Sequence, residues 1–348
     1  MVLKGKLISE KVPLGIDLGE SSIKIVELKH LRSKFALKRF TIDQIAVQES
    51  EQEDDGEKIG EYLKECLDKH GIKTKKAYLA LKNSDVMIRP MTFPPMPKKE
   101  LEQAVKYESD KHLMMPKNQA NIDWQITDST DKQISVLLLA ARKDLISKYH
   151  QVCETAGIKL AALDVEVFAL LRLIRFLEYH EPQDEGERPV GGELTLTLDM
   201  GSSSTTLLFT KNNRYVFSRN ISLGGTDFTR AISQELALSF RDAEQNQSQN
   251  NYLEYDSVRG RALDLLREIE RSVEYVNAQN LAKGDPEKLY VTGGGWRTKG
   301  LLDFVRDNVG MNPMIINPFK HIKSRGELVT EGMMASIATG LALRRWKK

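Results

Sequence analysis

Two distant segments of the sequence read almost alike, and each is an apolar stretch that ends in Asp-x-Gly-x-Ser-Ser. The first covers residues 14–22 and the second covers residues 196–204. In both copies a second alternating run follows the serines, which predicts a β-hairpin with Gly and Ser at its tip. A hairpin that occurs twice at this distance predicts a molecule built from two related halves.

The two tips carry groups that can bind phosphate and a cation. A glycine lets backbone N–H groups point at an anion without a Cβ in the way, and serine hydroxyls add donors. An Asp before each tip can hold a hydrated Mg²⁺, which prefers one or two carboxylates together with waters and phosphate oxygens. The predicted phosphate ligands are Gly19, Ser21, Ser22, Gly201, Ser202, Ser203 and Ser204, and the predicted metal ligands are Asp17 and Asp199. Either copy alone is more often an ordinary hairpin turn, so the duplication carries the prediction.

A third segment has the pattern of a nucleotide-approach loop. Residues 288–292 read as a short strand, Gly293, Gly294 and Gly295 follow, and residues 299–309 read as a helix. Three glycines allow a sugar and an α-phosphate to lie against the backbone, and the helix N-terminus adds partial positive charge. The spacing fits neither the P-loop nor the Rossmann fingerprint, so those nucleotide folds are excluded.

The composition is that of an ordinary globular protein. The chain has 348 residues, with 51 Lys and Arg against 49 Asp and Glu, and a net charge of +2. This length predicts about two domains, and the small net charge argues against a nucleic-acid partner. Cys66 and Cys153 lack a CxxC partner, so neither a zinc site nor a disulfide scaffold is expected. Since no apolar signal or spanning segment is present, we expect a cytoplasmic protein.

The three segments, in this order, resemble the two phosphate motifs and the adenosine motif of the actin-like ATPase superfamily. Within that superfamily the chain is most similar to the PilM family, the FtsA-like proteins of type IV pilus assembly. The resemblance covers nearly the whole chain. Besides residues 15–24, it is carried by residues 97–104, 140–143, 156–158, 163–166 and 224–226.

The resemblance implies an α/β, ribonuclease H-like fold with two actin-like lobes, duplicated sheets and an inserted 1C subdomain of the FtsA type. The expected first lobe, 1A, covers residues 1–190 and includes the insertion at about 90–158. The expected second lobe, 2A, covers residues 191–348, with 2B at about 226–285. ATP and Mg²⁺ are expected in the cleft between the lobes.

The resemblance also implies further nucleotide contacts, which are Gly225, Glu244, Glu268, Arg271 and Ser272. The family keeps a Lys shortly after the Glu at 244, whereas this chain has Asn246 and Gln247, a departure expected to weaken nucleotide binding. From the residues alone, the group at 268–272 also fits an ordinary charged helix face. Lys24 fits two roles equally, because it could neutralise phosphate or face solvent from a strand.

Actin-like ATPases often keep a residue that orients the attacking water at the place of Asp164 and Glu166. The alternative from the residues themselves is that Asp164 caps a helix and Glu166 is solvated. No catalytic residue is therefore assigned, and hydrolysis is expected to be slow or absent.

Local patterns predict the remaining elements. Helices are expected at residues 98–112, 144–156, 160–176, 228–240, 258–280 and 335–343, and strands at 122–128 and 133–140. A proline-rich joint is expected at 89–97, and loops at 180–192 and 242–251. The helix at 160–176 should cross between the lobes, and the helix at 335–343 should pack as the last helix of the second lobe rather than bind a membrane.

The implied partner is the cytoplasmic N-terminal peptide of PilN, held near the 1C insertion, and through it the PilO/PilP platform, with the pilus motor or other platform proteins as further partners. The protein would then be an ATP-binding adaptor that switches with nucleotide state, and would lie on the cytoplasmic face of the inner membrane only indirectly. Five methionines either line an adaptable peptide groove or fill a core, and they are Met87, Met91, Met96, Met114 and Met115. Alternatives are an FtsA-like filament protein of cell division, a scaffold of type II secretion and an actin-fold small-molecule kinase.

Overall fold

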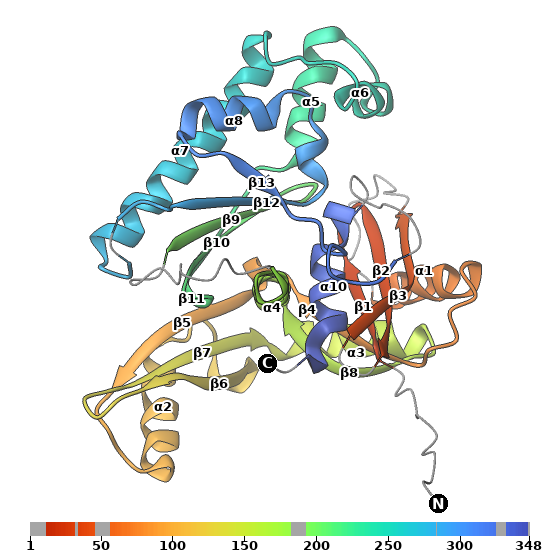
Figure 1. Ribbon diagram of the computed structural model, residues 1–348. Coiled ribbons are helices and arrows are strands. Elements are labelled where there is room, and N and C mark those ends of the chain that lie inside the picture. Colours follow the sequence, from red (N-terminus) through yellow and green to blue (C-terminus); the bar gives the residue numbers. More distant parts are fainter. Residues whose placement is uncertain are drawn as a thin grey trace, which may run out of the picture.

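The computed structural model describes residues 12–31, 34–45, 56–181, 193–282, 284–324 and 332–346. Most of the loop expected at residues 180–192, and with it the expected lobe boundary, lies outside these described residues. The described part of the chain forms three sheets flanked by helices (Figure 1).

The first sheet has five strands in the order β3-β2-β1-β4-β8. They are β1 (Leu14–Leu18), β2 (Ser22–Leu31), β3 (Lys34–Gln44), β4 (Lys76–Leu81) and β8 (Lys159–Val165). The first three strands form an antiparallel meander, and β4 and β8 run parallel to β1. The meander places the turn between β1 and β2 at the carboxyl end of β1, which is where the first Asp-x-Gly-x-Ser-Ser segment lies.

The second sheet repeats this plan in the order β11-β10-β9-β12-β13. Its strands are β9 (Leu194–Met200), β10 (Thr205–Lys211), β11 (Arg214–Ile221), β12 (Lys288–Thr292) and β13 (Pro313–Ile315). Again the first three are antiparallel, and β12 and β13 run parallel to β9. This confirms the two related halves predicted from the repeated hairpin and the duplicated sheets implied by the resemblance.

Helices cover both faces of the first sheet (Figure 1). On one side α1 (Gly56–Lys69) packs against α3 (Lys143–Thr155), and on the other α4 (Glu166–His180) packs against α10 (Ser336–Ala342). The second lobe carries α5 (Gly225–Leu236), α6 (Phe240–Gln247), α7 (Asp256–Ala278) and α8 (Leu301–Val309). None of the described helices combines the length and apolar character needed to cross a bilayer.

The position of α10 corrects the prediction for the C-terminal helix. Its side chains belong to the core of the first lobe, not the second. Small residues let it sit very close to its neighbours: a Cβ on Gly15 of β1 would lie 1.9 Å from the Ala338 carbonyl oxygen, and one on Gly340 would lie 2.0 Å from that of Ala169 in α4. This close approach fixes the helix against the first sheet, so the prediction of packing on the second lobe is wrong.

The third sheet is a small unit inserted between β4 and β8 of the first lobe. Its order is β5-β7-β6, with β5 (Val86–Phe93), β6 (Ala120–Ser129) and β7 (Ile134–Arg142), and α2 (Lys98–His112) belongs to the same segment. The predicted helix at 98–112 and the two predicted strands are confirmed. Part of the proline-rich joint is strand β5, which accommodates Pro90 because it lies at the sheet edge.

The packing of α3 bears on the expected bounds of the insertion. Tyr149, Val152 and Cys153 of α3 are buried in the core of the first lobe rather than in the small core of the third sheet. The inserted sheet itself spans residues 86–142, whereas the expected bounds were about 90–158.

Two local predictions are wrong. Residues 160–165 are strand β8 and the helix begins only at Glu166, because a short apolar run fits a buried strand as well as a helix. The polar stretch at 242–251 is not all loop, since α6 occupies Phe240–Gln247. Its start is fixed by Ser239, whose hydroxyl oxygen accepts a hydrogen bond from the Asp242 backbone N–H at 3.1 Å.

Candidate functional site

The two predicted metal ligands occupy matching places in the two sheets. Asp17 lies near the end of β1 opposite Lys24 of β2, and Asp199 lies near the end of β9 opposite Thr206 of β10. Asp17 is buried, and its Oδ2 lies 3.2 Å from the Lys24 Nζ. The duplicated hairpins therefore present one carboxylate from each lobe to the same region.

The electrostatics of this region show an excess of negative charge. Burial and the nearby charge of Asp17 raise the pKa of Asp199 to about 7, although Lys24 counteracts part of this effect. A third carboxyl joins them, because burial and the charges of Asp17 and Asp199 raise the pKa of Glu166 to about 8. Carboxyl groups whose pKa is raised by burial and by neighbouring carboxylates are stabilised in their charged form by a cation placed among them.

The donor set fits a hydrated Mg²⁺ better than a fully protein-bound ion. Within the described ranges, no three acidic, His or Cys side chains are close enough together to hold a metal ion by themselves. Mg²⁺ usually keeps several waters and takes one or two carboxylates together with phosphate oxygens. Asp17 and Asp199 match that requirement.

The first tip, residues 19–21, is closed by a hydrogen bond from the Gly19 N–H to the Ser22 carbonyl at 3.1 Å. Ser21 is exposed and Ser22 is buried. A Cβ on Gly19 would lie only 2.5 Å from the Lys24 Nζ, so the ammonium group lies directly over the tip. Lys24 is half-buried and pairs with Asp17, so of its two sequence interpretations the one in which it faces solvent is wrong.

The second tip, residues 201–204, is joined to the start of α5. The Gly201 N–H donates to the Ser204 carbonyl at 2.8 Å, and the Gly225 N–H donates to the Gly201 carbonyl at 3.0 Å. The Ser202 carbonyl accepts from both the N–H and the hydroxyl of Thr226, at 2.8 and 2.7 Å. The N-terminus of α5, including Gly225, is thereby held against the second tip.

The glycine segment after β12 packs against the same tip. Gly293 has a φ of 96°, and a Cβ on it would lie 2.3 Å from the Met200 carbonyl oxygen and 2.6 Å from the Asp199 Oδ1. A Cβ on Gly225 would lie 3.1 Å from the Gly295 Cα. The structure thus brings Gly201, Gly225 and Gly293–Gly295 together, and at Gly293 only a residue without a side chain allows this close approach.

Gln247 supports this assembly, and the sequence reasoning missed its role. It is buried, and its amide nitrogen donates to the Gly225 carbonyl at 3.1 Å and to the Thr298 Oγ1 at 2.6 Å, while its amide oxygen accepts from Thr229. It therefore links α5 to the segment after the three glycines. The departure from the family's Lys was the available signal, but the sequence did not show what Gln247 contacts.

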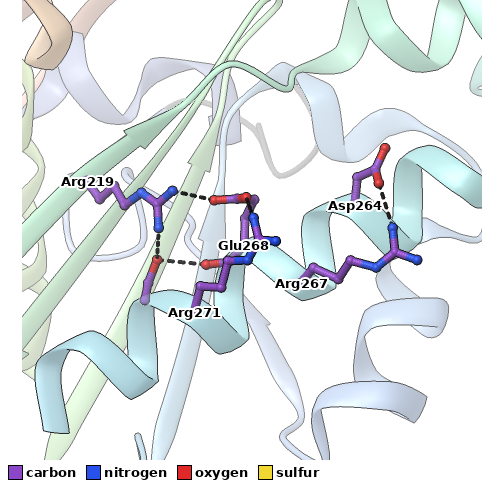
Figure 2. A network of polar contacts seen from close by, with 6 residues as sticks. Arg219, Asp264, Arg267, Glu268 and Arg271 are labelled. Carbon is purple, nitrogen blue, oxygen red and sulfur yellow. Dashed lines mark hydrogen bonds and ion pairs between the residues drawn. The ribbon is translucent and has the colours of Figure 1, made fainter. Parts of the chain in front are cut away.

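The three predicted contacts on α7 interact with one another and with β11 (Figure 2). Glu268 accepts from Arg271 at 2.8 Å and from Arg219 of β11 at 2.5 Å, and the Ser272 hydroxyl donates to the Glu268 carbonyl at 2.7 Å. These contacts match the alternative of a charged helix face and also anchor α7 to the sheet. Glu244 is exposed on α6, and no contact in the described structure joins it to the glycine segment.

Asp164 and Glu166 have different surroundings. Asp164 pairs with Arg172 at 2.8 Å and with Arg344, and it does not cap α4, whose N-cap is Val165. Glu166 is only partly exposed, and its Oε2 accepts a hydrogen bond from the Asn83 N–H at 3.2 Å. Helix capping by Asp164 is therefore wrong, and so is free solvation of Glu166, since Glu166 faces the two metal-ligand candidates.

Glu20 is a second residue that sequence reasoning missed. Its carboxylate lies 2.7 Å from the Lys82 Nζ and makes a side-chain hydrogen bond with Ser203 of the second tip. These contacts hold the pKa of Glu20 below its usual value even though burial opposes them. Glu20 connects the two tips across the space between the lobes.

A cavity of about 1470 Å³ lies between α4, β8 and the third sheet, and we call it the groove. Its apolar floor consists of Leu81, Val86, Leu137, Leu139, Ala141, Ile146, Leu163, Val165, Phe168 and Leu171. Charged side chains at its margin include Arg172, Arg175, Glu178, Arg214, Lys288 and Arg344. An apolar floor with a charged margin suits an extended peptide with apolar side chains.

The methionines are divided between a core and a second cavity of about 920 Å³. Met91 and Met96 pack on the core of the third sheet, and Met114 and Met115 line the second cavity. Met87 does both. None of the five lines the groove.

Two half-molecules with matching sheets, each presenting an Asp and a Gly/Ser tip to the space between them, define a protein of the actin-like ATPase fold. The sequence model of the family described as "Type IV pilus assembly protein PilM" matches residues 15–346. The chain belongs to this family.

Several solved structures are similar to this chain. The structure described as "PilM-PilN type IV pilus biogenesis complex" matches with a TM-score of 0.82 and 27% identity, over 96% of this chain and 98% of that one. EutJ, the ethanolamine utilization protein from Carboxydothermus hydrogenoformans, matches with a TM-score of 0.55 and 13% identity, over 95% and 89% of the two chains. MreB5 of Spiroplasma citri, solved bound to ADP, has a TM-score of 0.49 and 13% identity, over 95% of each chain.

Proposed function

We propose that this protein is a nucleotide-dependent adaptor of type IV pilus assembly, which binds ATP with Mg²⁺ between its lobes and the cytoplasmic N-terminal segment of PilN in the groove. The observation that carries the proposal is the course of α4. Glu166 at its first position faces the carboxylate site, and Phe168, Leu171 and Arg175 on the following turns line the groove. One helix therefore borders both proposed sites.

The nucleotide part of the proposal assigns a role to each segment of the site. Asp17 and Asp199 would hold Mg²⁺ through its waters, and the ion when bound would neutralise phosphate charge. The two tips would donate backbone N–H groups and serine hydroxyls to the phosphates, with Lys24 over the first tip. The three glycines after β12 would take the sugar and α-phosphate.

The group on α7 needs a rearrangement before it can contact a base or ribose. Glu268 and Arg271 would have to leave their pairings with each other and with Arg219. We retain these residues, with Ser272, as proposed nucleoside contacts and Glu244 as a more distant one.

Hydrolysis is expected to be slow. In the protein without a bound cation, a pKa of about 8 keeps Glu166 mostly protonated at neutral pH, and no other side chain is proposed as the general base. Nucleotide would then act by holding a lobe arrangement rather than by being turned over.

The partner part of the proposal rests on the groove and on the similarity to the PilM–PilN complex. Through PilN the protein would join the PilO/PilP platform and contact motor or platform proteins on the cytoplasmic face of the inner membrane. Family membership favours this role over a filament-forming division protein or a small-molecule kinase. We also propose the lobe division near residue 190, with α10 assigned to the first lobe.

The test is calorimetric titration of nucleotide-stripped protein with a synthetic peptide of the PilN N-terminal segment, with and without Mg·ATP. Tighter binding with Mg·ATP, by a coupling of about 1–3 kcal/mol, is the expected result for a nucleotide-coupled adaptor. Equal binding in both conditions would leave a constitutive scaffold. No binding in either condition would refute the assignment of the groove to PilN.

A further inference from the structure

The hairpin of β10 and β11 extends from the nucleotide site to the groove. At one end, β10 begins with Thr205 directly after the second tip, and β11 ends with Ile221, which pairs with Thr205. At the other end the two strands are joined by Asn212 and Asn213, with φ values of 52° and 59°, which is the conformation of a tight hairpin turn. The seven residues of β10 separate the two ends by about 23 Å.

The turn of this hairpin, residues 212–214, docks on α4 of the first lobe. The Arg175 Nε donates to the Asn213 carbonyl oxygen at 2.5 Å. Glu178, one turn further along α4, makes a side-chain hydrogen bond with Asn213 and accepts from the Tyr290 hydroxyl at 3.5 Å. Asn212, Asn213 and Arg214 all line the groove, so the second lobe supplies part of its wall.

The same turn also contacts the third sheet. The Arg214 guanidinium lies 3.2 Å from the Asp128 carboxylate of β6. Next to it, the ring of Tyr215 lies 5.5 Å from that of Phe168, which belongs to the groove floor. A displacement of the turn must therefore change its contacts with both walls of the groove.

The hairpin is stiff enough to transmit a displacement. Every residue of β10 pairs with a residue of β9 in an unbroken register, and with a residue of β11 across one register shift between Phe209 and Thr210. A strand held by ladders on both edges moves with its sheet as one body, because bending it breaks several hydrogen bonds at once. A shift of the second tip toward the first lobe would therefore move the turn in the groove.

We propose that the β10–β11 hairpin is the lever that couples the nucleotide site to the groove, and that Arg175 and Asp128 are the positioning residues that hold its turn against the two groove walls. The inference rests on the proposed function and specifies how that switch works. A phosphate held between the tips sets the position of residues 201–204, and the turn then sets the width of the groove at α4 and β6.

The test measures coupling, defined as the ratio of the peptide dissociation constants without and with Mg·ATP. The variant is Arg175→Met with Asp128→Asn, which removes the Arg175 hydrogen bond to Asn213 and the negative charge opposite Arg214, keeps the aliphatic stem of the arginine, and leaves the Glu178–Asn213 hydrogen bond in place. The matched control is Arg267→Met with Asp264→Asn, an exposed ion pair of 2.9 Å on α7. Exposed pairs contribute little to stability, so both proteins should fold, and thermal unfolding checks this.

The expected result is a coupling of about 5- to 150-fold in the unchanged protein and in the control, and about threefold or less in the Arg175/Asp128 variant. Mg·ATP affinity measured without peptide should be equal in all three proteins. A variant that had lost its structure would instead bind Mg·ATP more weakly.

Full coupling in the Arg175/Asp128 variant would overturn the lever and leave the proposed function intact. Loss of coupling in the control as well would also overturn it, because the effect would not belong to the turn. If the unchanged protein binds the peptide equally with and without Mg·ATP, the nucleotide switch and the lever are both refuted. If it does not bind the peptide at all, the groove assignment fails.

Discussion

Asp17 and Asp199 occupy matching positions in two separate sheets, yet the charge of Asp17 helps to raise the pKa of Asp199 to about 7. The relationship shows that the repeated hairpins are not merely similar but face one another. The same two charges raise the pKa of Glu166. Such a site favours a cation, which takes the place of the protons that the carboxyl groups otherwise keep near neutral pH.

We expect Asp17→Asn and Asp199→Asn each to lower Mg·ATP affinity by at least about tenfold, because each removes a charged ligand from a poorly solvated site. Calorimetric titration at fixed Mg²⁺ would measure the change. Asp303→Asn, an exposed carboxylate on α8, serves as the control and should leave affinity unchanged. Unaltered binding in both site variants would show that the nucleotide binds elsewhere.

The pH dependence of stability follows from the raised pKa values of Asp199, about 7, and Glu166, about 8. In the unfolded chain both carboxyls have a pKa of about 4. Between that pH and the pKa values of the folded protein, the folded state therefore holds more protons than the unfolded state. The free energy of unfolding must then fall as pH rises from about 5 to 8.5. A Tm series in this range should show the decline for the protein without nucleotide.

The variant Glu166→Gln with Asp199→Asn should flatten that decline, since neither side chain can then release a proton on unfolding or on a rise in pH. Mg·ATP should bind more tightly at about pH 8 than at pH 6, because cation and protons compete for the same carboxyls. A Tm decline as steep in the double variant as in the unchanged protein would assign the effect to other groups.

Gly293→Ala should lower the free energy of unfolding by about 1–3 kcal/mol, because the residue has a positive φ and its Cβ would overlap the Met200 carbonyl. It should also weaken nucleotide binding by displacing Asp199. Gly260→Ala in α7 is the matched control, since nothing lies within 4 Å of its Cβ position. That change should stabilise the helix by about 0.5–1 kcal/mol, so a similar effect of both substitutions would contradict the close approach.

Much of the arrangement of the candidate site could be predicted from sequence because its signals are local. The alternation of β1 and β2, the Gly and Ser at their tip and the three glycines after β12 each depend on a few neighbouring residues. The repetition of the hairpin then predicts that two such tips meet. Neither step needs knowledge of contacts between distant residues.

What the sequence did not reveal depends on contacts between segments far apart in the chain. Gln247 looks like any polar residue of a surface loop until α5 and the glycine segment surround it. The final helix follows the second lobe in the chain but packs on the first, because Gly15 and Gly340 leave room for it there. A small residue in the sequence can indicate that two elements pack closely, but it does not indicate which element packs against it.

Gln247→Ala should destabilise the protein by about 1–3 kcal/mol, because it leaves the Gly225 carbonyl and the hydroxyls of Thr229 and Thr298 without this buried partner. Since Gln247 holds the start of α5 against the glycine segment, nucleotide affinity should fall too. The control is Gln249→Ala, at an exposed position two residues further along the chain, which should change neither the stability nor the nucleotide affinity. Normal stability in Gln247→Ala would mean that water replaces the amide without cost.

The groove can be tested independently of the nucleotide site. Leu139 of β7 lies on its apolar floor, whereas Ile126 of β6 is 41% exposed and lies outside it. Leu139→Ser should weaken binding of the PilN peptide by about tenfold, which corresponds to roughly 1.4 kcal/mol, because the polar side chain removes apolar contact area from the floor. Ile126→Ser should leave peptide affinity unchanged, and Mg·ATP affinity should be equal in both variants. Peptide binding reduced equally by the two substitutions would indicate that the outer surface of the third sheet, rather than the groove, holds the partner.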